Sequence, residues 1–168
     1  MPYGEAFCPA RCVTYFSTVS KLVVECGVVG IMKLIVGGYA QGKLDYVRLK
    51  YHLQADMVWD SVLPICENDF KDTDSAGNTI VVNHFHRWVR TCMTEGGCPE
   101  DEIRVFLKEC ENRNIDCIII SDEIGNGIVP IDAFEREYRE RVGRILVQLA
   151  EQAEEVERVL CGIGQKIK

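Results

Sequence analysis

The sequence has few basic residues and no long apolar run. Its 19 Lys and Arg residues are outnumbered by 26 Asp and Glu residues, which gives a formal net charge of −7. A protein that binds nucleic acid through its phosphates needs a basic surface, so this charge balance argues against a nucleic-acid partner. No stretch reaches the ~18 apolar residues that a membrane-spanning helix requires, so we expect no membrane partner either.

The sequence also lacks the cysteine spacing of a metal site. Its nine cysteines include no C-x-x-C pair, which argues against zinc, and their odd number does not suit a disulfide framework. Two of them, Cys110 and Cys117, stand where a small apolar residue would serve equally well. This usage predicts reduced thiols and a cytoplasmic protein.

The first 31 residues carry no clear targeting signal. No basic segment precedes their apolar stretch, and Lys21 and Glu25 interrupt it, so a signal peptide is not predicted. Met32 then opens MKLIVGG, a pattern typical of a first strand. We therefore expect an appendage over residues 1–31, which a start codon assigned too far upstream would explain, and one domain over 32–168. The alternative is an added strand or helix that packs on the domain edge.

Strand and helix patterns alternate from residue 32 onward. Compact apolar runs predict strands, and apolar residues repeating at three and four positions predict helices. The alternation indicates an α/β fold with a mainly parallel sheet and helices on both faces. The ligand crevice of such a sheet lies beyond the carboxyl ends of its strands. The predicted strands are 33–36, 57–65, 79–83, 115–121 and 156–161, and the predicted helices are 43–54, 84–93, one that starts at Pro99, and 132–155.

A glycine-rich stretch, VGGYAQGKLDY, lies between the first predicted strand and the first predicted helix. It fits G-x-x-x-x-G-K, a loop whose backbone N–H groups and lysine bind phosphate. The strand–loop–helix context is the one such a loop needs, because the helix N-terminus also attracts the anion. We therefore predict a nucleotide site formed by Gly37, Gly38, Tyr39, Ala40, Gln41, Gly42, Lys43 and Leu44. The alternative is a glycine turn followed by a surface lysine.

The residue after Lys43 departs from this pattern. A Ser or Thr there normally supplies a hydroxyl to Mg²⁺, and Leu44 cannot do so. Asp45 comes next, but a helix turns it about 100° away from that spot. A metal ion would therefore need water and other carboxylates, for which Asp122 and Glu123 are the candidates.

Those two carboxylates belong to a second polar segment, SDEIGNGIVP, which follows the most apolar predicted strand. Its position at the carboxyl end of that strand places it at the expected crevice. Gly125 and Gly127, on either side of Asn126, allow the backbone to approach a ligand closely. We expect this segment to form part of the active-site rim, and a solvated loop is the alternative.

These segments resemble the adenosylcobinamide kinase/adenosylcobinamide-phosphate guanylyltransferase family. The likeness covers about residues 32 to 168 and is strongest from Ile118 onward, where E-x-G-x-G-I-V-P is followed at a matching distance by K-I-K. GGYAQGK is similar to the family's phosphate loop, and NHFHRWV resembles the end of its third strand, with Trp88 matching a tryptophan there. The resemblance implies a P-loop NTPase-like fold and a role in assembling the nucleotide loop of cobalamin.

The resemblance also implies a chemistry. The family phosphorylates adenosylcobinamide with ATP or GTP, and then moves GMP from GTP onto the phosphate through a guanylylated histidine. It implies Mg²⁺ with the nucleotide, a corrinoid partner and a homo-oligomer. Carried over to this sequence, the glycine loop would hold phosphate, and Lys43 and Glu123 are the catalytic candidates.

The sequence departs from the family at the places that serve the metal and the histidine. Asn83 stands where the family's third strand ends in an acid, and the histidine-bearing segment before that strand is not recognisable. His52 lies on the first helix, whereas His84 and His86 follow the third strand and are, together with Asn83, rim candidates. We therefore favour phosphoryl transfer over guanylyl transfer. The alternative is a non-catalytic module that binds nucleotide or corrinoid, and a purely structural role explains neither motif.

Overall fold

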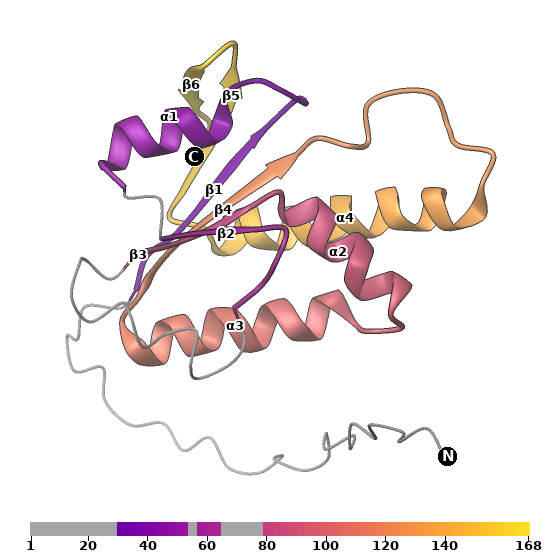
Figure 1. The fold of residues 1–168 in the computed structure, drawn as a ribbon, viewed down its shortest axis with the longest axis horizontal. Coiled ribbons are helices and arrows are strands. Elements are labelled where there is room, and N and C mark those ends of the chain that lie inside the picture. Colours follow the sequence, from indigo (N-terminus) through magenta and orange to yellow (C-terminus); the bar gives the residue numbers. More distant parts are fainter. Residues whose placement is uncertain (1–29, 54–56, 65–78) are drawn as a thin grey trace, which may run out of the picture.

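The computed structural model describes residues 30–53, 57–64 and 79–168. In these ranges a six-stranded sheet lies between two layers of helices (Figure 1). One face is covered by α1 (Lys43–Tyr51), and the other by α2 (Phe85–Thr94), α3 (Pro99–Arg113) and α4 (Ala133–Gln152). The predicted α/β fold with helices on both faces is confirmed. Most of the predicted appendage (residues 1–29) and the predicted polar connection (67–78) lie outside the described residues.

The sheet has the strand order β2-β3-β4-β1-β5-β6. All neighbouring strands run parallel except β5 and β6, which are antiparallel. The register places Gly37 opposite Asp122 and Asp60 opposite Asn83, so the ends of four strands meet at one edge. The strands are β1 (Met32–Gly37), β2 (Val58–Asp60), β3 (Thr79–Asn83), β4 (Asp116–Asp122), β5 (Glu155–Leu160) and β6 (Ile163–Lys166).

The carboxyl-terminal segment differs from the sequence prediction in two ways. The helix predicted to reach residue 155 ends at Gln152, because Ala153 adopts an extended conformation and Glu155 already pairs in the sheet. The helical repeat of apolar residues continues through Ala153, which is buried. The sequence pattern therefore predicted a helix end that lies too far along the chain. The segment GIGQKIK, left without structure by the prediction, contributes β6. Cys161 and Gly162 both have positive φ, as a tight hairpin loop requires, but Cys-Gly is not a usual turn signal.

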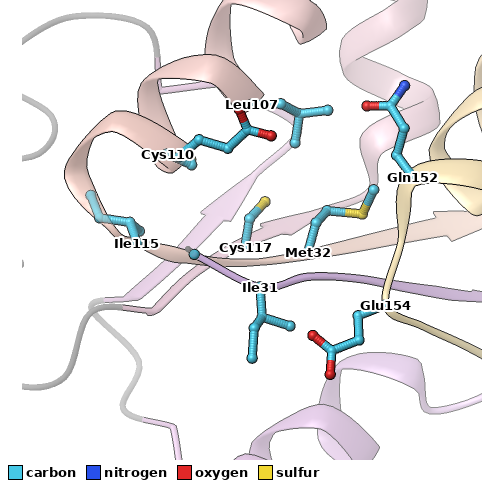
Figure 2. A pocket seen from close by; sticks show the side chains of 10 residues that line it. Ile31, Met32, Leu107, Cys110, Ile115, Cys117, Gln152 and Glu154 are labelled. Carbon is cyan, nitrogen blue, oxygen red and sulfur yellow. The ribbon is translucent and has the colours of Figure 1, made fainter. Parts of the chain in front are cut away.

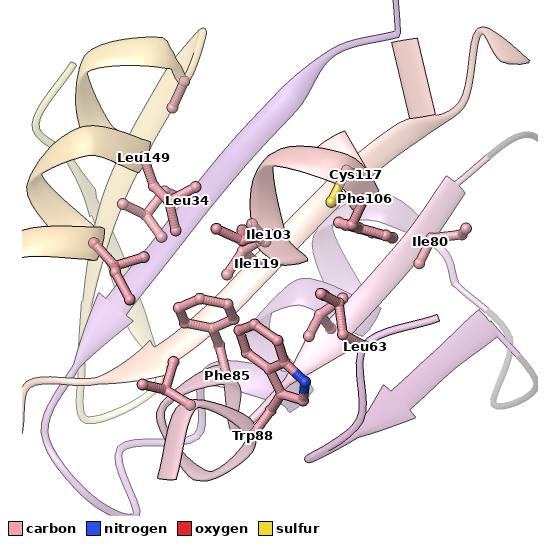
Figure 3. Packing of buried hydrophobic residues seen from close by; sticks show 14 of the residues in the cluster. Leu34, Leu63, Ile80, Phe85, Trp88, Ile103, Phe106, Cys117, Ile119 and Leu149 are labelled. Atoms are coloured by element: carbon pink, nitrogen blue, oxygen red, sulfur yellow. The ribbon is translucent and has the colours of Figure 1, made fainter. Parts of the chain in front are cut away.

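Alternate residues of β4 enter different cores. Ile118 and Ile120 face the small core under α1, while Ile119 faces the larger core under α2, α3 and α4. Figure 3 shows the larger core, where the rings of Phe85 and Trp88 lie side by side at 5.2 Å between centroids. Because β4 is buried on both faces, the residues at its carboxyl end are held in a fixed position. Of the helices in the described ranges, none has the length and apolar character to cross a membrane.

Candidate phosphate-binding site

The glycine loop leaves β1 at the carboxyl edge of the sheet and is held there by close contacts. A Cβ on Gly37 would lie 2.4 Å from a backbone oxygen of β5, so a larger residue does not fit without movement. Gly42 has a φ of 74°, which glycine adopts without strain. The Cys161 N–H donates to Gln41 Oε1 at 2.7 Å, and the Gly162 N–H donates to the Gln41 carbonyl at 2.9 Å. The β5–β6 hairpin therefore braces the loop.

The lysine of the loop is buried against the neighbouring strand. Lys43 is 7% exposed. Its Nζ donates to the Gly38 carbonyl at 2.7 Å and lies 2.5 Å from Asp122 Oδ1. A buried ammonium group needs such partners to offset the loss of its hydration. The positive charge is thus held at the mouth of the loop, where an incoming phosphate would compete with Asp122 for it.

Asp122 is positioned in turn by His86. The Asp122 N–H donates to His86 Nδ1 at 3.2 Å, and His86 Nε2 lies 3.6 Å from Asp122 Oδ2. Burial lowers the pKa of His86 to about 4, although the Asp122 carboxylate acts in the opposite direction. The ring is therefore neutral at neutral pH, and its one lone pair, on Nδ1, is already used. His86 orients Asp122 and has no free nitrogen lone pair with which to attack a substrate.

The Glu123 carboxylate is bound by an arginine of the sheet rather than by the lysine of the loop. Arg158 on β5 binds it with two nitrogens, Nε at 2.8 Å from Oε1 and Nη2 at 2.9 Å from Oε2. Asn126 Nδ2 donates to Oε2 at 3.1 Å, while the Glu123 N–H donates to the Gly37 carbonyl at 2.9 Å. The sequence did not indicate Arg158, because its partner lies 35 positions away along the chain.

Two cavities adjoin beyond the carboxyl ends of β1, β3 and β4. The first has a volume of about 340 Å³ and the second about 600 Å³, and Tyr39, Arg87 and Asp122 line both. The predicted rim residues Gly125, Asn126 and Gly127 lie in an exposed loop and line neither cavity. The first cavity is completed by Ala40, Gln41, Gly42, Lys43, Leu44, Asp45, Asn83 and His84, and the second by His86, Arg90, Thr91, Glu123, Ile124, Glu135, Tyr138 and Arg139.

The sequence prediction also missed Asp60. This residue ends β2, and its Oδ1 lies 2.6 Å from Asn83 Nδ2 and 2.6 Å from His84 Nδ1. It was overlooked because it stands inside a stretch predicted as an apolar strand over 57–65, whereas β2 spans only Val58–Asp60. The sequence would have indicated Asp60 only if it had shown that the strand ends at this residue.

A third cavity, of about 250 Å³, lies at the opposite end of the sheet (Figure 2). Met32 and Cys117 reach it from the start of β1 and β4, and Leu107 and Cys110 reach it from α3. Its wall combines apolar side chains with the polar residues Glu111, Gln152 and Glu154. It is lined by none of the predicted site residues, so we place the functional site at the carboxyl edge.

The residues present do not form a ready magnesium site. Both candidate carboxylates are engaged by cations, Asp122 by Lys43 and Glu123 by Arg158. Within the described residues, no three side chains of His, Cys, Asp or Glu gather as metal ligands would. Leu44 lines the first cavity at the position where a hydroxyl was expected.

A mostly parallel sheet, with a glycine loop between β1 and α1, makes the chain a P-loop NTPase-like protein. A family model described as cobinamide kinase / cobinamide phosphate guanyltransferase matches residues 59–167, well over half of the chain. The chain belongs to this family, as its sequence resemblance predicted. The matched residues begin after the glycine loop, so the family match does not cover that loop. Its interpretation as a phosphate-binding loop rests on its geometry.

Two curated relatives align with part of the chain. The bifunctional adenosylcobalamin biosynthesis protein CobU of Salmonella typhimurium is 38% identical over 69 residues, which are 41% of this chain and 38% of the relative. The protein of the same description from Escherichia coli K12 is 39% identical over 67 residues, which are 40% of this chain and 37% of the relative. The alignments thus span well under half the length of either relative.

Proposed function

We propose that the chain is a nucleotide-dependent phosphotransferase of cobalamin biosynthesis that acts on a cobinamide. The observation that carries this proposal is the buried Lys43 ammonium group, held between the glycine loop and Asp122 at the wall of a 340 Å³ cavity. Membership of the family supports the corrinoid substrate class. ATP or GTP is the phosphoryl donor.

Each part of the loop has a role in holding the donor. The backbone N–H groups of the loop and the positive end of α1 attract the phosphates. Lys43 exchanges its contact with Asp122 for phosphate oxygens and offsets their charge. Phosphoryl transfer depends mainly on such positioning and electrostatic stabilisation, because the protein contributes little covalent chemistry.

Mg²⁺ enters this proposal only as the companion of the nucleotide. The described carboxylates do not form a ready ligand set, and Leu44 and Asn83 replace the hydroxyl and the acid that the family resemblance implies. We therefore assign no step to a protein-bound metal ion.

Phosphoryl transfer is favoured over guanylyl transfer because of the state of the histidines. A guanylylated histidine needs a ring nitrogen that is free and open to the cavity. His52 is exposed at the end of α1 and lines neither cavity, and the Nδ1 lone pair of His86 is occupied. The remaining histidine, His84, lines the 340 Å³ cavity but follows β3, whereas the histidine that the family resemblance implies comes before the third strand, so His84 is not the counterpart of that nucleophile.

The test is transfer of label from γ-labelled ATP or GTP to adenosylcobinamide. Lys43→Met keeps the aliphatic stem and removes the charge, so we expect it to lower the rate by about 10²–10³, the usual effect of losing one preorganised electrostatic contact. Lys108→Met, at an exposed position of α3, is the matched control and is expected to match the wild type.

The melting temperature separates the two readings of the site. Nucleotide that raises the melting temperature of the wild type but not of Lys43→Met, without any labelled product, would favour the non-catalytic binding module. If nucleotide produces neither product nor a shift in melting temperature, the proposed function is wrong.

A further inference from the structure

Three polar side chains meet where β2 and β3 end side by side. Asp60 Oδ1 accepts a hydrogen bond from Asn83 Nδ2 at 2.6 Å and lies 2.6 Å from His84 Nδ1. A carboxylate oxygen and a ring nitrogen approach this closely only with a proton between them, so His84 carries its proton on Nδ1. Asn83 Nδ2, 3.0 Å from the same ring nitrogen, directs its hydrogen to Asp60. The lone pair of the neutral ring is therefore on Nε2.

The backbone of His84 is unusual for its place in the chain. It precedes α2 with φ 50° and ψ 42°, the left-handed conformation, and its side chain makes no capping hydrogen bond. Ser, Thr, Asn or Asp is preferred at such a position because those side chains accept from the first N–H groups of the helix. Residues in strained conformations are concentrated at functional sites. Helix formation alone therefore does not account for a histidine here.

The side chain of His84 also faces the proposed phosphate site. It is 31% exposed and lines the 340 Å³ cavity together with Lys43 and Asp122. Lys43 follows β1, Asp122 ends β4 and His84 follows β3, and β4 lies between the other two strands. The charged and titratable groups around His84 in the described residues are Tyr39 from the glycine loop, Asp60 from β2, His86 and Arg87 from α2, Lys43 and Asp45 from α1, and Asp122 from β4.

We propose that His84 is the general base of the phosphoryl transfer and that Asp60, supported by Asn83, is its positioning residue. This inference rests on the proposed function. The acceptor hydroxyl gives its proton to His84 Nε2 while its oxygen bonds to the γ-phosphorus. The bond from that phosphorus to the bridging oxygen breaks, and the nucleoside diphosphate leaves with the electron pair. Asp60 stabilises the imidazolium ion, as the carboxylate does in other carboxylate–histidine pairs.

The first test compares the kinetics of His84→Gln with those of the wild type. We expect kcat to fall by about 10²–10⁴, the usual contribution of a general base, while KM for the nucleotide changes by less than about threefold. A reaction that depends on a general base loses rate at low pH, and we expect His84→Gln to lack this dependence. Asp60→Asn should also lower kcat, because an amide does not stabilise the imidazolium ion as a carboxylate does. The control variant is His52→Gln. A wild-type kcat and pH profile in His84→Gln would overturn the proposal.

The second test measures the accessibility of the ring without turnover. Diethyl pyrocarbonate acylates a neutral imidazole at its free nitrogen, and mass spectrometry of peptides locates the adduct. We expect His84 to react and to be protected by ATP or GTP. His52 should react without protection, because it is exposed and lines neither cavity, and buried His86 should not react.

The outcomes distinguish the inference from the function on which it rests. If nucleotide raises the melting temperature and product forms, but His84 is unprotected, the base assignment is wrong and the proposed function stands. If the γ-label remains on His84 after denaturation, the residue is a nucleophile, and the assignment as a base is again wrong. If there is neither a shift in melting temperature nor any product, both proposals fail.

Discussion

Helix α1 carries two lysines that meet carboxylates at the same distance in different surroundings. Lys43 Nζ lies 2.5 Å from Asp122 Oδ1, and Lys50 Nζ lies 2.5 Å from Glu157 Oε1. The first pair is buried on both sides and lines a cavity. The second pair joins α1 to β5, where the Tyr46 hydroxyl donates to Glu157 Oε2 at 3.0 Å.

The difference lies in what else can bind each lysine. Lys50 has a second carboxylate, Glu155, at 3.5 Å and two tyrosine rings within 6 Å, so its partners are fixed by the fold. Burial alone would lower the pKa of Lys50, but the hydrogen bond to Glu157 raises it well above the ordinary value. Among the described residues, Lys43 contacts one carboxylate and one carbonyl, and it lines a cavity. A buried ion pair contributes little net stability, so a pair beside a cavity calls for a functional explanation.

Breaking the Lys43 pair should give the largest effect on stability. Asp122→Ala leaves the buried ammonium without its carboxylate, and we expect the free energy of unfolding to fall by about 3–5 kcal/mol. Urea unfolding of the wild type and the variant measures this change. The matched variant is Lys43→Met with Asp122→Leu, which removes both charges and should recover most of the loss. A double variant as unstable as Asp122→Ala would show that the pair is not the cause.

The second prediction concerns pH, because His86 supports Asp122. Its pKa is about 4 in the folded chain and about 6.5 in an unfolded one, so the unfolded chain binds more protons between these values. The stability that His86 contributes is complete above pH 6.5 and is lost as the pH falls to 4, in total roughly 2–3 kcal/mol. Urea unfolding at several pH values should show a smaller loss over this window in His86→Gln. An equal loss in both proteins would contradict the prediction.

The sequence predicted the parts of the site that depend on local pattern. The glycine loop lies between a strand and a helix, and Asp122 and Glu123 follow a strand buried on both faces, because strand, turn and helix signals act over a few residues. The contacts between these parts depend on strand order and register. The pairing of Lys43 with Asp122 requires β1 to lie beside β4, which no local pattern states.

Three of the site residues that the sequence did not indicate show why such residues are missed. Asp60 stands at the end of a three-residue strand, and its role depends on β3 lying alongside. Arg158 meets Glu123 only because β5 packs on the other side of β1. Arg87 lines both cavities but carries no motif that separates it from an ordinary exposed helix residue.

The third prediction concerns the pair of Lys50 with Glu157, whose partners are fixed by the fold. Glu157→Gln keeps the shape of the buried side chain and removes its charge, while Glu155 remains within reach of Lys50. We expect the free energy of unfolding to fall by about 1–2 kcal/mol, the usual contribution of a hydrogen bond to a charged group. The rise in melting temperature caused by nucleotide should equal that of the wild type. A lost nucleotide response would mean that this pair also belongs to the site.

The smallest effect is expected at Glu123, the second catalytic candidate from the sequence. Its carboxylate is bound by Arg158, whose side chain is 52% exposed, so the pair is partly solvated and contributes at most about 1 kcal/mol. Glu123→Gln should therefore change the free energy of unfolding by less than that amount. It should also lower the transfer rate by less than tenfold, in contrast to Lys43→Met, because the carboxylate points toward β5 and does not line the 340 Å³ cavity. A loss of a hundredfold or more in the same assay would return Glu123 to the catalytic group and would imply that Arg158 releases it when substrate binds.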